Sequence, residues 1–154
     1  MNFEKEIEKR LVESLQGALG DLAKVRGSWQ TVEKGDVKDL EDATEPVYVD
    51  IRLSTAAFPT YSATLGEWTG SLAVYVPVAM DPTGEMLDAV WDVVSAWLYA
   101  MQLSLADAKR ALDIEGAFTT HGFLVSGGVG VELVDGERVV PAAFLIRGKF
   151  QMAK

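Results

Sequence analysis

The stretch from Gly70 to Gln102, GSLAVYVPVAMDPTGEMLDAVWDVVSAWLYAMQ, constrains the fold most, because its hydrophobic period changes within it. In residues 71–79, apolar side chains alternate with other residues, which is the pattern of a β-strand. After Pro82 the apolar residues recur at spacings of three and four, which is the pattern of an amphipathic helix. We expect Asp81 to cap this helix and Pro82 to occupy its first position, where no N–H is needed.

The rest of the chain adds helices and strands in separate runs. Residues 2–25 predict an amphipathic helix that ends near Gly27, and residues 47–54, VYVDIRLS, predict a half-buried strand. A short helix is expected at residues 104–112. Further strands are expected at residues 117–125, 129–134 and 139–152, the last two joined by a hairpin turn at Asp135-Gly136.

Runs of one element type, rather than strict alternation, favour an α+β fold. We expect a largely antiparallel sheet with an N-terminal amphipathic helix and a long central helix packed on it. With 154 residues, 49% of them hydrophobic, the chain is long enough for one domain over residues 1–154.

Aromatic residues in irregular sequence are the first candidates for an interface. Residues 55–69, TAAFPTYSATLGEWT, predict a long connection between antiparallel strands and contain Phe58, Tyr61 and Trp68. Together with Trp29 these side chains suit the core of a protein interface, where aromatic residues are enriched. The alternative is that they cover the sheet edge or the helix within one chain. An acidic linker at residues 33–46 precedes them.

Pro77 marks the strand at residues 71–79 as an edge strand or a bulged one, because proline cannot donate a hydrogen bond to a neighbouring strand. Such an edge has two interpretations. The proline can blunt the edge against aggregation, or the edge can contact another subunit.

Asp81, Glu85, Asp88 and Asp92 lie at spacings of four, three and four, and therefore form an acidic ridge along one side of the central helix. The ridge can be a solvated face whose first residues complement the helix dipole. It can also meet a basic partner surface, or hold a divalent cation through carboxylate oxygens. The solvated face and the partner contact are the stronger alternatives, and no metal is expected.

No pattern in the sequence predicts catalysis or a cofactor. The only histidine, His121, lacks a nucleophile or metal-ligand companion at a suitable spacing, and the chain has no cysteine. Residues 126–130, SGGVG, are followed by a predicted strand rather than a helix, so a turn or bulge is expected there instead of a phosphate site. The net charge of −9 argues against gripping nucleic acid, and Asp88 and Asp92 interrupt the longest apolar helix, so no membrane span is expected.

The order of elements resembles that of the small tail-terminator and tail-completion (neck) proteins of long-tailed bacteriophages. The matching features are the N-terminal helix, the acidic loop, the VYVDIRLS strand, the long helix after MDP, and the C-terminal hairpin ending in AAFLIRGKF. The resemblance implies a non-enzymatic virion protein that forms a ring, a hexamer, on the tail tube. It also implies contacts with the tail tube protein and the head-connector protein, and assembly in the host cytoplasm.

A second hypothesis is a small-molecule-binding module, with a pocket between the central helix and the sheet roofed by residues 55–69. An enzyme that uses carboxylates is the weakest hypothesis. Paired catalytic acids need environments that push their pKa values apart, and a solvated ridge does not supply that asymmetry.

Overall fold

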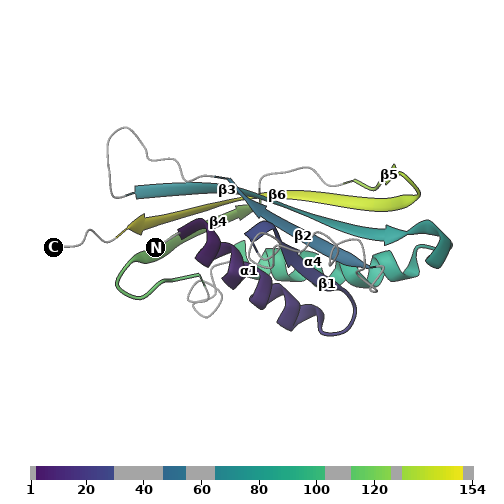
Figure 1. Cartoon of the computed structure of the whole chain (residues 1–154), viewed down its shortest axis with the longest axis horizontal. Helices are drawn as coiled ribbons and strands as arrows, with labels where there is room; N and C mark the ends of the chain where they lie inside the picture. Colours follow the sequence, from purple (N-terminus) through teal and green to yellow (C-terminus); the bar gives the residue numbers. More distant parts are fainter. Residues whose placement is uncertain (1–2, 30–46, 55–64, 103–111, 126–129, 151–154) are drawn as a thin grey trace.

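The structure is a computed structural model that describes residues 3–29, 47–54, 65–102, 112–125 and 130–150. Two helices cover one face of a six-stranded sheet with strand order β1-β2-β3-β6-β4, and β5 pairs with β6 (Figure 1). The helical elements are α1 (Phe3–Leu19), the 3-10 turn η1 (Val78–Met80) and α4 (Glu85–Gln102). The strands are β1 (Lys24–Gly27), β2 (Tyr48–Leu53), β3 (Leu65–Pro77), β4 (Phe118–Val125), β5 (Glu132–Val134) and β6 (Glu137–Phe150).

The predicted α+β class is confirmed, with a sheet that is mostly antiparallel. Strand β1 runs parallel to β2, whereas each of the other strand pairs in the described residues is antiparallel. The predicted N-terminal helix is present, and the long central helix has 18 residues. No helix in the described residues is both apolar enough and long enough to cross a membrane.

The N-terminal helix is shorter than the predicted span of residues 2–25. It ends at Leu19, because Gly20 adopts a left-handed backbone with φ of 58° and donates its N–H to the carbonyl oxygen of Gln16 at 2.9 Å. Leu22 continued the apolar pattern in the sequence, yet its side chain is 47% exposed. The following residues form β1, which lengthens the sheet instead of the helix.

Strand β3 begins at Leu65, so the prediction of irregular structure through residue 69 was wrong. Inward-facing positions of β3 and β6 carry Gly66, Gly70 and Gly148, and aromatic rings lie directly against them. A Cβ atom at Gly148 would be 2.1 Å from the ring of Phe118, and one at Gly66 would be 2.2 Å from the ring of Phe150. Glycine at these buried positions hid the strand from a search for alternating apolar residues.

Strand β3 lies between β2 and β6, so the prediction that it is an edge strand was wrong, although at Pro77 itself its only paired neighbour among the described strands is β6. Pro77 is the last residue of β3, and pairing with β2 stops at Tyr75. The next residue, Val78, donates its N–H to the carbonyl of Gly136 on the β6 side. Because N–H groups alternate along a strand, the nitrogen of Pro77 faces the side where β2 has ended, and no ladder hydrogen bond is lost.

The central helix packs as predicted but starts later. It begins at Glu85 rather than at Pro82, since residues 78–80 form η1 and a turn follows. Its buried side chains are Leu87, Val90, Val94, Trp97, Leu98 and Met101. Trp91, expected on the same apolar face, is only half-buried at its border.

The C-terminal hairpin has the predicted turn. Asp135 and Gly136 both adopt positive φ, 49° and 79°, as a two-residue type I′ turn requires. Strand β5 lies inside its predicted range, β6 starts at Glu137, two residues earlier than expected, and β4 starts one residue later than expected. Of the short helix expected at residues 104–112, only Leu112 lies in the described part, and its side chain is buried.

Candidate assembly surface

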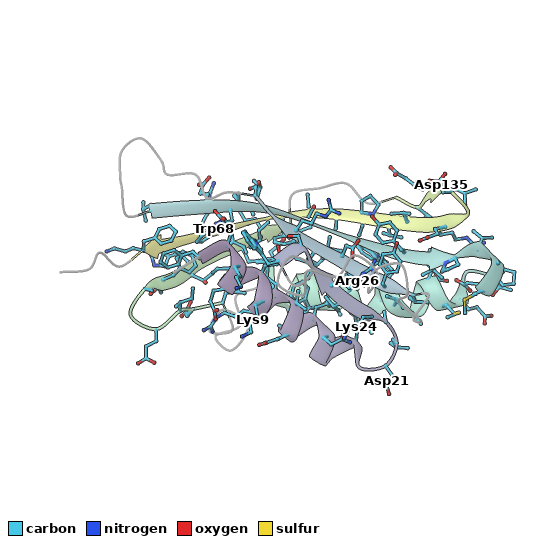
Figure 2. All side chains as sticks on the ribbon, viewed as in Figure 1. Lys9, Asp21, Lys24, Arg26, Trp68 and Asp135 are labelled. Carbon is cyan, nitrogen blue, oxygen red and sulfur yellow. The ribbon has the colours of Figure 1, made fainter. Side chains whose placement is uncertain are left out.

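The structure separates the aromatic residues that the sequence analysis grouped together. Trp68 lies in β3 with 0% of its surface exposed, and its ring contacts Phe118 and Phe150 edge-on at centroid distances of 4.8 and 5.2 Å. It is therefore part of the core and unavailable to a partner (Figure 2). Phe58 and Tyr61 lie outside the described residues.

Trp29 is half-buried, and its backbone N–H donates a hydrogen bond to a buried carboxylate. Glu8 of α1, with only 1% of its surface exposed, accepts hydrogen bonds from the Trp29 backbone N–H at 2.8 Å and from the Ser28 hydroxyl at 2.9 Å. These bonds satisfy a buried carboxylate and fix the chain after β1 against α1. These contacts involve the backbone and not the indole ring of Trp29, so its interface role stays a prediction.

Asp81 is structural as well. Its side chain is 3% exposed, and its two carboxylate oxygens accept the N–H groups of Met86 at 3.1 Å and Leu87 at 3.0 Å. These are free N–H groups of the first turn of α4, so the predicted capping role is confirmed, although Asp81 acts from four residues before the helix. Arg138 of β6 donates to the Asp81 carbonyl oxygen and lies 3.8 Å from its carboxylate.

The environment of Asp81 predicts a pH dependence of stability. Burial alone would raise the pKa of Asp81, but the N–H groups of Leu87 and Met86, together with Arg138, outweigh burial and lower that pKa. The stabilisation by the ionised carboxylate is complete above its ordinary pKa and is lost as the pH falls below about 4. We expect Asp81→Asn to lower the thermal unfolding midpoint at pH 7, with a gap to the wild type that closes in acid.

Asp92→Asn is the matched control for that measurement, because Asp92 is exposed on the same helix. Its midpoint at pH 7 is expected to stay close to that of the wild type. A gap for Asp81→Asn that remains constant down to about pH 2 would contradict the assigned role of the carboxylate.

The other three acids of the predicted ridge are exposed on the outer face of α4. Glu85, Asp88 and Asp92 point away from the sheet, and α4 contains no lysine or arginine. With Asp81 turned inward, the ridge has three members instead of four. Within the described residues, no group of three or more His, Cys, Asp or Glu side chains is placed to hold a metal ion.

Apolar side chains gather at one end of the molecule, and the sequence analysis missed them. We call this surface the hairpin end; it comprises strand β5 and the exposed side chains of Met80, Met86, Val131, Leu133 and Val134. Leu133 is the most exposed of them, at 72%. The sequence VELV, residues 131–134, contains a signal for this exposed surface. Leu133 and Val134 place apolar side chains on both faces of β5, a strand that pairs only with β6 in the described residues.

The hairpin end is fixed to the helix layer by polar contacts. Val78 of η1 donates to the Gly136 carbonyl at 3.0 Å, and Arg138, the cross-strand neighbour of Leu133, reaches the carbonyls of Asp81 and Pro82. Met80 and Met86 lie on either side of the Asp81 cap. The end of β3, the start of α4 and the β5 hairpin therefore meet at the same end of the molecule (Figure 1).

The outer backbone edge of β5 is available for pairing. In the described residues β5 pairs only with β6, and all three of its residues are exposed. Exposed edge strands offer N–H and C=O groups to a strand from another chain. A cluster of exposed apolar side chains beside such an edge is typical of a protein-binding surface.

Two further features singled out in the sequence are His121 and the glycine-rich stretch at residues 126–130. His121 is exposed on β4, where the register shifts between Thr120 and Gly122, as expected of a surface residue. Of the glycine-rich stretch at residues 126–130, only Gly130 lies in the described part, so its prediction as a turn stays a prediction.

The interface between α4 and the sheet is occupied by side chains where it is described. Val94 is fully buried, and Trp97 packs edge-on against Phe123 of β4 at a centroid distance of 6.2 Å. The indole N–H of Trp97 donates to the Ser14 hydroxyl of α1 at 3.0 Å. The small-molecule pocket proposed for this region stays a prediction, and no contact described here favours it.

The sequence matches no model of a known protein family, and it matches no curated protein. Any function has to be inferred from the surfaces that the fold leaves exposed and from the resemblance in element order.

Proposed function

We propose that this chain is a structural subunit of a long-tailed bacteriophage virion that caps the tail tube as a ring. The observation that carries the proposal is the hairpin end, because its exposed apolar side chains lie on an anchored scaffold and need a protein partner to be buried. In this proposal, copies of the chain form a hexameric ring at the neck of the virion. The hairpin end contacts the tail tube, and the ring also meets the head connector.

The anchoring of the hairpin end favours a binding role over a simple exposed loop. A mobile apolar loop would lose conformational freedom on binding, which weakens association. The Val78–Gly136 and Arg138 hydrogen bonds hold Leu133 and Met80 in place beforehand. A preorganised apolar surface of this kind can form a stable contact with little further ordering.

The resemblance in element order supports the particular assembly. The elements on which it rests are α1, the β2 strand of VYVDIRLS, α4 after MDP, and β6 with its AAFLIRGKF sequence. Strand β3 is central and not the edge strand that was predicted. The resemblance is unaffected, because it concerns the order of elements along the chain. The resemblance implies a non-enzymatic role, and the proposal adopts it.

Co-purification with the tail tube protein encoded by the same genome tests the proposal. The wild-type chain is expected to co-purify with tubes, and Leu133→Asp is expected to lose this binding, because it places a charge in the proposed contact. Leu22→Asp is the matched control: Leu22 is also an exposed leucine, but it lies in the α1–β1 turn next to Asp21, far from Asp135 in Figure 2. Loss of binding in both variants alike, or no binding by the wild type, would contradict the proposal.

A further inference from the structure

The sheet has a second face that carries no helix in the described structure. Both α1 and α4 lie on the other face, where the core is (Figure 1). We call this surface the open face and define it by the outward-pointing residues of β1, β2, β3 and β6 away from the hairpin end. An antiparallel sheet can leave one face to solvent, but the composition of this one is unusual.

Four small side chains form a flat area on the open face, beside the stacked rings of Tyr48 and Tyr75, whose centroids are 4.6 Å apart. Ser71 of β3 lies opposite Ala143 of β6, and Ala73 lies opposite Pro141. These four residues are half-buried or exposed, and none carries a charge. Small side chains over a sheet allow another backbone element to approach closely.

The rim of the open face is positively charged, although the whole chain has a net charge of −9. Two of the carboxylates on this side of the sheet are paired, Asp50 with Arg26 at 3.1 Å and Glu67 with Arg147 at 2.9 Å, and a third, Glu137 of β6, lies near Tyr48. Three further cations, Lys24, Arg52 and Lys149, have no ion-pair partner among the described residues. Among the described residues, the face therefore combines uncharged side chains near its centre with an excess of positive charge at its rim.

The outer face of α4 has the opposite character. Its exposed residues include Glu85, Asp88 and Asp92, with no basic residue in the helix to neutralise them. Ala89 and Ala96 are also exposed on α4, and Tyr99 is 62% exposed near its C-terminal end. The acidic part of this helix is complementary in charge to a sheet with a cationic rim.

We propose that the open face of one copy of this chain receives the outer face of α4 from a second copy. The two surfaces lie on opposite sides of one molecule, because α4 packs on the covered face of the sheet and turns its acids away from it. A contact between different surfaces is head-to-tail and continues from copy to copy, which closes into a ring when the rotation allows. This inference rests on the proposed function and assigns the contact between subunits, whereas the hairpin end is assigned to the tube.

Cross-linking can test this contact cleanly, because the chain has no cysteine of its own. Ser71→Cys marks the open face next to Arg52, its cross-strand neighbour, and Ala96→Cys marks the outer face of α4. A chain with both cysteines, treated with a short bismaleimide at high protein concentration and low salt, is expected to give a ladder of multimers. The control pair, Ala96→Cys with Lys9→Cys on the exposed side of α1, is expected to give no ladder.

Charge reversal adds a second readout to the same experiment. Asp88→Lys with Asp92→Lys is expected to abolish the ladder, and adding Arg52→Glu with Lys149→Glu to that chain is expected to restore it. Higher salt is expected to weaken the wild-type ladder, since screening reduces attraction between exposed charges. Circular dichroism checks that each variant is folded.

Two results would overturn the inference. One is a ladder of equal intensity from the control pair, and the other is the absence of a ladder from the Ser71→Cys and Ala96→Cys chain. If tubes are still capped in either case, the proposed function stands and the subunit contact is different. If the chain neither forms a ladder nor binds tubes, both proposals fail.

Discussion

Replacing Trp68 with alanine is expected to lower the free energy of unfolding by about 3–5 kcal/mol. The side chain is fully buried on the covered face of the sheet, and it contacts the rings of Phe118 in β4 and Phe150 in β6. Its removal leaves a cavity beneath a cluster of aromatic rings that cannot collapse without moving the strands. Urea unfolding followed by circular dichroism measures the loss.

Two further variants show whether burial is the cause. Trp68→Phe keeps most of the ring and removes an indole N–H that is buried without a hydrogen-bond partner, so it is expected to cost less than the alanine variant. Trp91→Ala is also expected to cost less, because Trp91 is only half-buried at the border of the core. A loss below about 1 kcal/mol for Trp68→Ala would place Trp68 outside the core.

Replacing Gly148 with alanine is expected to destabilise the protein by about 1–3 kcal/mol, although the same change stabilises a protein where the native structure has room for the methyl group. The new Cβ atom would lie 2.1 Å from the Phe118 ring and 2.6 Å from the Thr119 backbone carbonyl oxygen. The ring can shift only at the expense of its contacts with Trp68 and Phe150, and the carbonyl belongs to the paired strand β4. The same unfolding measurement detects the loss.

Gly122→Ala is the matched control for Gly148→Ala. Gly122 lies in β4, next to β6, and a Cβ atom there would have no neighbour within 4 Å. We expect the free energy of unfolding of the Gly122→Ala variant to stay within about 0.5 kcal/mol of the wild-type value. Equal losses for the two variants would mean that glycine is needed for its backbone and that the ring contact is irrelevant.

The spacing of apolar residues was enough to predict the elements that bury a single apolar face. The alternation in VYVDIRLS and the spacing of Leu87, Val90, Val94, Leu98 and Met101 both correspond to observed elements, β2 and α4. The Asp135-Gly136 turn was predictable for a local reason, since a type I′ turn needs positive φ at both positions.

The errors arise where the apolar pattern along the chain and the actual burial or pairing disagree. The start of β3 was missed because Gly66 and Gly70 face the core and leave room for rings from β6. The end of α1 was missed because Leu22 extends the helical period past Gly20, whose left-handed backbone ends the helix. Pro77 was misplaced because the end of a central strand tolerates proline as well as an edge does.

The candidate surface was less predictable than the fold. The exposed acids Glu85, Asp88 and Asp92 were correctly placed on the polar face of α4, but Asp81 is buried as a cap and Trp68 is in the core. The positive rim of the open face depends on which strands are neighbours. That arrangement brings Lys24, Arg52 and Lys149 to one face from three separate strands, and no pattern along the chain encodes it.

The most direct test of the proposed function is electron microscopy of tail tubes assembled with and without this protein. If the chain is a tail terminator, tubes grown with it are short, of uniform length, and carry a ring at one end. Tubes grown without it, or with Leu133→Asp, are expected to vary in length and to have bare ends. Bare tube ends and unlimited growth in the presence of the folded wild-type chain would contradict the account.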